Sequence, residues 1–380
     1  MAAAGDQAAG GLASRIGQTA VRLFLSDYFV LYLSLAYFLV LVPFLPTLYN
    51  PANIANVLSN MWPLLAVAVG QTFVLTIAGI DLSQGSVVGF TSVVAAALLA
   101  TTASPDVLSN APIWGVLIDE SGGLLHGVPG ALIIGIAITL VAGTFIGMLN
   151  GLGVAVFRMP PFMVTLVAMI TISALGIYLT QSENIRHLPE AYIELGKGDI
   201  VSVYLGEQDE PRIPRREIYS LITYPMIISV LLALMAHVLL NRTVFGRYVF
   251  AIGTNRKAAE ISGVPVRRVI TQVFMISAFC ATVGAILFSA RLEAGRPTLG
   301  DGNFLLDVIG ATVIGGTSLF GGKGKIKWTV FGVLFFVLLS NSLNLMNLSA
   351  FTIDMVKGSV ILVAALLDVL RSRLVTVGSK

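Results

Sequence analysis

The strongest constraint on this chain is a long stretch near its start without a single acidic or basic side chain. From Tyr28 to Ile80 the sequence contains no Asp, Glu, Lys, Arg or His. Of the 380 residues, 56% are hydrophobic and only 11% are charged, whereas about 25% are charged in an ordinary soluble protein. Because such a stretch suits a bilayer and not a solvated surface, the sequence predicts an all-α polytopic membrane protein.

Segments of roughly 20 mostly apolar residues mark the expected spans. They predict about ten transmembrane helices, with both termini on one side. The chain then divides into an N-terminal tail (1–27), a transmembrane domain (28–370) and a C-terminal tail (371–380). The expected spans are 29–48, 64–80, 87–103, 128–149, 163–180, 218–240, 270–290, 303–320, 328–346 and 354–370.

The positions of Lys and Arg predict the orientation. Most of the 23 lysines and arginines fall in the tails and in loops on the side of the N-terminus, whereas the loop 104–127 has none. We therefore expect both termini and the segment 241–269 to be cytoplasmic. The polar insert 181–217 then lies outside, where Ile200–Leu205 predicts a short strand or hairpin. This insert is either a solvated loop or a docking surface for an external partner.

A short, well-delimited helix is expected in the basic run GTNRKAAEISGVPVRR. Asn255 is a good N-cap, Gly263 can end the helix in the left-handed conformation, and Pro265 prevents its continuation. So short a helix is marginal alone, so another surface must pack on it. Its small-residue face is formed by Ala258, Ala259 and Ser262. From spacing alone, an ordinary cytoplasmic loop that contains one turn of helix is the preferred interpretation.

Two glycine- and serine-rich interruptions lie inside the apolar sequence. Asp81 sits in the first, IAGIDLSQGS, and a charged residue at mid-bilayer costs about 2.5–3.5 kcal/mol. The second runs from Gly315 to Gly324. Irregular backbone at this depth must be buried in protein or line an aqueous path. The paired interruptions predict discontinuous or re-entrant helices in two structurally related halves, although the two runs do not align residue by residue.

Polar residues in or beside the spans are candidates for a translocation pathway for hydroxylated solutes. Asp81 could instead cap the following helix, and Asn or Gln could instead bond between helices. Asp307 is expected at a helix start, and Asp354 is expected to pair with Lys357. The pathway candidates are Gln71, Asp81, Ser83, Ser86, Asn150, Thr312, Asn341 and Asn344.

The sequence gives no support for an enzyme. GGTSLFGGKGK fails as a phosphate-binding loop, because Thr317 occupies the first required glycine position and Gly324 follows Lys323. The three histidines are far apart, so no metal cluster is expected, and a net charge of +3 implies no nucleic-acid partner. An ion-coupled secondary transporter is a further alternative, but such proteins place several ionisable residues within their spans.

Three runs of the sequence resemble permease subunits of ABC importers of the ribose, xylose and galactose type. They are Gly79–Ser86, Gly246–Gly263 and Ala290–Gly324, within a likeness that covers about 55–370. The run Lys257-Ala258-Ala259-x-x-x-Gly263 resembles the permease helix that docks on the ATPase, with Lys257 at the usual glutamate position.

The resemblance implies a monosaccharide permease of the bacterial inner membrane, embedded in lipid, that works as a homodimer. It implies no cofactor in this chain, because a separate cytoplasmic subunit binds ATP and Mg²⁺, and it implies an external solute-binding protein. Nucleosides, an autoinducer or branched-chain amino acids are alternative cargoes. The residues expected to couple to the ATPase are Thr254, Asn255, Lys257, Ala258, Ala259, Glu260, Ser262 and Gly263.

Overall fold

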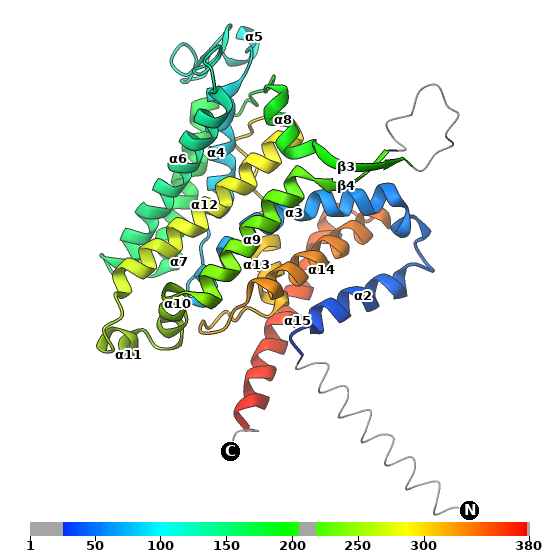
Figure 1. Cartoon of the computed structure of the whole chain (residues 1–380), viewed down its shortest axis with the longest axis vertical. Helices are drawn as coiled ribbons and strands as arrows, with labels where there is room; N and C mark the ends of the chain where they lie inside the picture. Colours follow the sequence, from blue (N-terminus) through cyan, green and yellow to red (C-terminus); the bar gives the residue numbers. More distant parts are fainter. Residues whose placement is uncertain (1–25, 205–217, 378–380) are drawn as a thin grey trace, which may run out of the picture.

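A computed structural model describes residues 26–204 and 218–377, and each expected span coincides with a helix (Figure 1). Among the described residues, six helices are long and apolar enough to cross a bilayer, and α2, α4 and α13 are shorter apolar helices. The helices that correspond to the expected spans are α2 (Phe29–Leu41), α3 (Pro51–Thr76), α4 (Gln84–Leu99), α6 (Ala131–Ala155), α7 (Pro161–Thr180), α9 (Tyr224–Arg242), α12 (Val266–Leu292), α13 (Phe304–Gly315), α14 (Ile326–Leu345) and α15 (Ala350–Val377).

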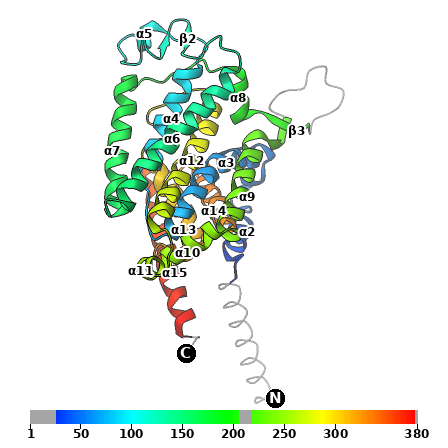
Figure 2. The same cartoon turned by 60° about the vertical axis from the view of Figure 1, so that its left-hand side comes forward.

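Shorter elements occupy the two ends of the molecule. One end carries α5 (Pro105–Leu108), α8 (Glu190–Lys197) and two antiparallel pairs, β1 (Ile118–Asp119) with β2 (Gly122–Gly123) and β3 (Asp199–Tyr204) with β4 (Ile218–Thr223). The other end carries α10 (Val244–Thr254) and α11 (Arg256–Ile261). Figures 1 and 2 show that α2 begins and α15 ends at the α10–α11 end.

Several expected spans have different bounds. The largest shift is in the span expected over 64–80, because α3 begins at Pro51. Three of the other differences have a local cause. The helix expected over 29–48 ends at Leu41, because Pro43 and Pro46 follow and the 3-10 turn η1 (Pro46–Tyr49) takes over. The span expected over 303–320 ends at Gly315, since Gly316 adopts a φ of 113°.

The third difference is at 218–240, whose first residues form β4. The helix begins only at Tyr224, where the Thr223 hydroxyl accepts from the Met226 N–H at 3.3 Å. The strand expected at Ile200–Leu205 is found as β3, but α8 in the same insert was not predicted. The expected C-terminal tail, 371–380, is helical through Val377 as part of α15. The expected N-terminal tail lies, up to residue 25, outside the described residues, as do 205–217 of the insert.

Helices α3 and α12 form the centre of the fold. Within their most apolar windows, 83% of the residues of α3 and 78% of those of α12 are buried, against 11% in α7. Peripheral helices carry large exposed side chains such as Ile133 and Val141 of α6. A helix that is apolar on all sides and buried belongs to the core, whereas one with exposed apolar faces suits contact with lipid tails.

A stripe of glycines brings α6 into close contact with α12. Gly143, Gly147 and Gly151 repeat every fourth residue on one face of α6. A Cβ atom at Gly147 would lie 2.4 Å from the Phe274 carbonyl oxygen of α12. Small residues at this spacing let two helix backbones approach in a membrane.

Gly147→Leu is expected to push α6 away from α12 and to lower the apparent melting temperature of the purified protein, because overpacking a close contact costs typically 1–3 kcal/mol. Gly358→Leu on α15 is the control, since a Cβ there meets nothing within 4 Å. Gel filtration after heating in detergent measures both variants. Equal melting of the two would show that this contact does not limit stability.

Candidate functional site

The first interruption, residues 77–83 between α3 and α4, is folded around a buried carboxylate. Asp81 is only 1% exposed. Its Oδ1 atom accepts hydrogen bonds from the backbone N–H of Ser83 at 2.9 Å and from the Ser83 hydroxyl at 2.6 Å. Asp81 therefore organises the turn that precedes α4, whose N-cap is Ser83.

The same carboxylate joins helices that are distant in sequence. Its Oδ2 atom accepts from the Ser277 hydroxyl of α12 at 2.7 Å, and the Gln84 amide donates to Ser277 at 2.9 Å. Asn150 of α6 donates to the Ser83 hydroxyl at 2.8 Å. We call Asp81, Ser83, Gln84, Asn150 and Ser277 the Asp81 network. A buried charge held by several donors in this way ties α4, α6 and α12 together.

The sequence predicted Asp81, Ser83 and Asn150 of this network, placed Gln84 in the same motif without counting it among the pathway candidates, and missed Ser277. Ser277 lies in an apolar segment with no motif around it, so no sequence signal distinguishes it from a helix-packing serine. The predicted candidate Ser86 lies next to the network, where its hydroxyl donates to the Ser83 carbonyl at 2.8 Å.

The other predicted pathway residues lie elsewhere. Thr312 donates to carbonyls within α13, and Asn344 is exposed and donates to the Ser340 carbonyl. Asn341 exchanges two hydrogen bonds with Asn53, at 2.8 and 2.9 Å, so it bonds between helices. Gln71 is fully buried, and its amide has no partner among the described residues.

The expected pair of Asp354 and Lys357 is not formed. The Lys357 ammonium instead lies 2.9 Å from the Asp307 carboxylate, and both side chains are largely buried. Asp307 is in the first turn of α13, as predicted. The ion pair therefore links α13, which carries Asp307, to α15, which carries Lys357.

The second interruption, 316–325 between α13 and α14, touches the first. The Gly322 N–H donates to the Thr76 carbonyl at the end of α3, at 2.9 Å. A Cβ atom at Gly321 would lie 2.7 Å from the Cβ of Ala78. The two interruptions that the sequence paired by composition are thus neighbours in space.

The end of α10 lies against the same backbone contact between Thr76 and Gly322. A Cβ atom at Gly253 would lie 1.8 Å from the Thr76 carbonyl oxygen and 2.6 Å from the Gly322 nitrogen. Only glycine permits this approach of three backbones. We call Thr76, Ala78, Gly253, Gly321 and Gly322 the glycine junction. Two of the three resembling runs supply its glycines, and the third begins one residue after Ala78.

The short helix α11 follows directly from the junction. Its predicted ends are confirmed, because the Asn255 side chain accepts from the Ala258 N–H at 3.0 Å and Gly263 has a φ of 83°. Thr254 ends α10, where its hydroxyl donates to the Phe250 carbonyl.

The small-residue face of α11 is divided between the interior and solvent. Ala259 is 5% exposed and belongs to the core of its own chain. Lys257, Ala258, Glu260 and Ser262 are exposed. Among the described residues, the most exposed large apolar side chain is Ile261 of α11, at 88%, which was not among the residues predicted to couple to the ATPase.

An ion cluster ties the start of α2 to the second interruption. The Asp27 carboxylate accepts from Lys327 at 2.7 Å and from Lys325 at 2.9 Å. These hydrogen bonds lower the pKa of Asp27 to about 2, from an ordinary value of 3.8. The contact therefore contributes stability above pH 3.8 and loses it as the pH falls toward 2.

Ser277→Ala is expected to destabilise the protein, because it leaves Asp81 Oδ2 without its donor and leaves the Gln84 amide with only the longer bond to the Val67 carbonyl, at 3.4 Å. An unsatisfied buried polar group costs about 1–3 kcal/mol. Cys280→Ala, one turn further along α12 and also buried, removes a side chain of similar size without a hydrogen bond. The melting temperature in detergent should fall further for the serine variant. A larger loss in the cysteine variant would contradict the weight given to the network.

Comparison with known proteins identifies the family. Residues 53–365 match the family described as branched-chain amino acid transport system / permease component. The ribose import permease of Bacillus subtilis (strain 168) is 33% identical over 325 residues, which cover 85% of this chain and 86% of the relative. The xylose transport system permease of Escherichia coli (strain K12) is 29% identical over 358 residues, covering 83% and 84%.

The L-arabinose ABC transporter permease of Azospirillum brasilense is 28% identical over 323 residues, covering 85% of this chain and 81% of the relative. No solved structure matches the chain. The chain belongs to this family of transport-system permease components. It is accordingly a multi-pass permease of the inner membrane and not an enzyme.

Proposed function

We propose that this chain is the permease subunit of an ATP-driven importer for a monosaccharide. The family description names branched-chain amino acids, but the relatives described above are named for ribose, xylose and L-arabinose. In the proposed assembly two copies of the chain form the solute path at their shared interface. A separate cytoplasmic subunit binds ATP, and an external solute-binding protein docks at the end formed by α5, α8 and β3–β4. Both termini lie with α11 on the cytoplasmic side.

The glycine junction is the observation that supports this function most directly. Helix α11 is the exposed part of the chain best suited to an ATPase, and α10 leads from it to the backbone of Thr76 and Gly322. A displacement of α11 therefore reaches the interruptions after α3 and after α13 through main-chain contacts. ATP-driven closure of the ATPase pair would in this way shift the permease between inward- and outward-facing states.

The Asp81 network suits a gate for hydroxylated solutes. In the described conformation Ser83, Asn150 and Ser277 are bonded to each other or to Asp81. A sugar hydroxyl both donates and accepts, so it can replace a serine hydroxyl in such a network without leaving a buried group unpaired. An apolar side chain of a solute could not do so, which favours a polyol over a branched-chain amino acid.

Uptake into membrane vesicles tests the proposed function. With the genetic neighbours that encode an ATPase and a solute-binding protein co-expressed, vesicles should accumulate labelled ribose, xylose or arabinose only while ATP is supplied. An ionophore that collapses ion gradients should leave uptake intact. Loss of uptake with the ionophore, at constant ATP, would favour the second candidate, an ion-coupled transporter that uses the buried Asp81.

Ile261→Glu is expected to abolish co-purification with the ATPase subunit, because it places a charge at the most exposed apolar position of α11. Arg256, Lys257, Arg267 and Arg268 flank this position, which suits a partner groove with an apolar floor and an acidic rim. Glu260→Gln, an exposed change on the same helix, should preserve the complex. A stable complex of the Ile261→Glu variant would show that the ATPase binds another surface.

A further inference from the structure

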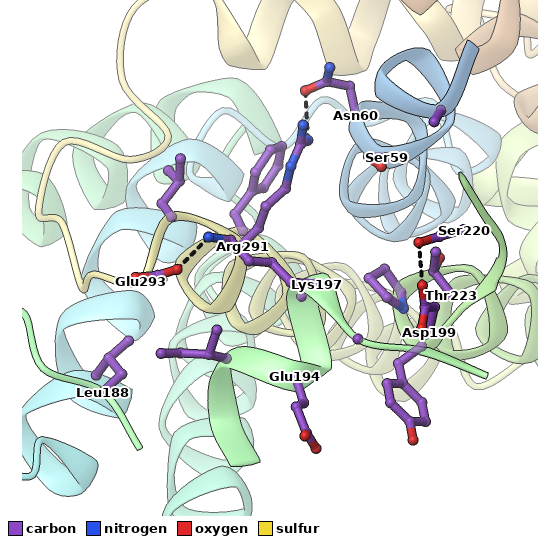
Figure 3. Close-up of a pocket in the computed structure, with 18 of the residues that line it drawn as sticks. Ser59, Asn60, Leu188, Glu194, Lys197, Asp199, Ser220, Thr223, Arg291 and Glu293 are labelled. Atoms are coloured by element: carbon purple, nitrogen blue, oxygen red, sulfur yellow. Dashed lines mark hydrogen bonds and ion pairs between the residues drawn. The ribbon is translucent and has the colours of Figure 1, made fainter. Parts of the chain in front are cut away.

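A large cavity opens at the outer end of the molecule, opposite α11. Its volume is about 1360 Å³, and it lies between α8, the base of the β3–β4 hairpin and the outer ends of α3 and α12 (Figure 3). It exceeds the roughly 300–1,000 Å³ of most small-molecule pockets. A small solute could therefore contact only one wall at a time.

One wall of the cavity presents an arginine without an acidic partner. Arg291 Nη1 donates to the Asn60 side-chain oxygen at 2.7 Å (Figure 3). Its Nη2 donates to the Asn56 side-chain oxygen at 3.3 Å. Both acceptors are neutral, and none of the ion pairs among the described residues includes Arg291. A guanidinium has five N–H groups, so it retains donors for a ligand while the two asparagines fix its position.

Two aromatic rings line the same cavity. The centroids of Phe288 and Phe304 lie 5.5 Å apart with the rings at 79°, in an edge-to-face arrangement. The face of an aromatic ring carries negative potential, so the weakly positive C–H groups of a sugar ring pack favourably on it. Arg291 supplies donors for hydroxyl oxygens, and the rings supply a surface for the carbon skeleton.

The charge of the lining argues for a neutral ligand. The cavity is lined by two cations, Lys197 and Arg291, and by more carboxylates than cations. Lys197 is paired with Glu293, and Asp199 accepts a hydrogen bond from Ser220. The remaining carboxylates, Glu190 and Glu194, would repel an anion such as phosphate.

We propose that this cavity is a low-affinity monosaccharide-binding site of the permease chain itself, centred on Arg291 and Phe288. The inference rests on the proposed function and adds to it a binding site for the solute on the permease chain. Helix α12 carries both Arg291 and Ser277, which lie about 21 Å apart along the helix axis at about 1.5 Å per residue. The site therefore lies outward of the Asp81 network along α12, and weak binding there would allow the solute to leave inward.

Binding to the purified full chain, without ATPase or solute-binding protein, tests the site. Saturation-transfer NMR with D-ribose, D-xylose and L-arabinose as probes should show contact with the protein for at least one of them. Arg291→Gln and Phe288→Leu should each weaken the apparent affinity about tenfold, the usual effect of losing a hydrogen bond to a charged group or a packed ring. Arg186→Gln, exposed at the same end but outside the cavity lining, should bind as the unaltered protein does.

The outcomes separate the site from the function. Equal sugar binding by the unaltered protein and by both cavity variants would overturn the site, as would binding that phosphate or leucine displaces. If the permease binds no sugar and Arg291→Gln instead weakens binding of the solute-binding protein to the permease, Arg291 belongs to the docking surface for that protein and the site is overturned. Sugar binding that both variants weaken supports the site even where vesicle uptake fails to depend on ATP, a result that would refute only the proposed function.

Discussion

A carboxylate buried inside a membrane protein must be solvated by the protein itself, and the centre of this fold is arranged around that requirement. Asp81 receives three hydrogen bonds, two from Ser83 and one from Ser277. Those donors fix the turn between α3 and α4 and the position of α12 beside it. Asn150 and Gln84 bond to these two serines and extend the network to α6 and along α4, so the hydrogen bonds around one carboxyl group connect four central segments.

The sequence predicted the helices well because bilayer thickness sets their length and composition. It failed where composition does not determine structure: β4 is as apolar as a span, and the turn after α2 depends on Pro43 and Pro46. The caps of α11 were predictable because Asn255 and Gly263 act on their own neighbours. Ser277 was not, since it acts on Asp81, which is distant in sequence.

Contacts between residues that are distant in sequence also explain other features, near the outer and inner ends of the molecule, that the sequence did not predict. Asp354 and Lys357 are close in sequence, but Lys357 pairs with Asp307 on another helix. Ile261 is a large apolar residue, and nothing in its local sequence indicates that its side chain is 88% exposed. In the sequence Arg291 is only a charged residue near a helix end, whereas in the structure its guanidinium is held by Asn56 and Asn60 of α3. Pairing across helices is a property of the fold, which local patterns do not contain.

The glycine junction also determines how the two interruptions can move. Its contacts are made largely by main-chain atoms of Thr76, Gly253, Gly321 and Gly322, so no long side chain is present that could change rotamer and absorb a small shift. A displacement of α10 would therefore be transmitted directly to both interruptions together. Under the proposed function, this contact would make the two interruptions open and close together, and concerted opening would limit leakage of solute between transport cycles.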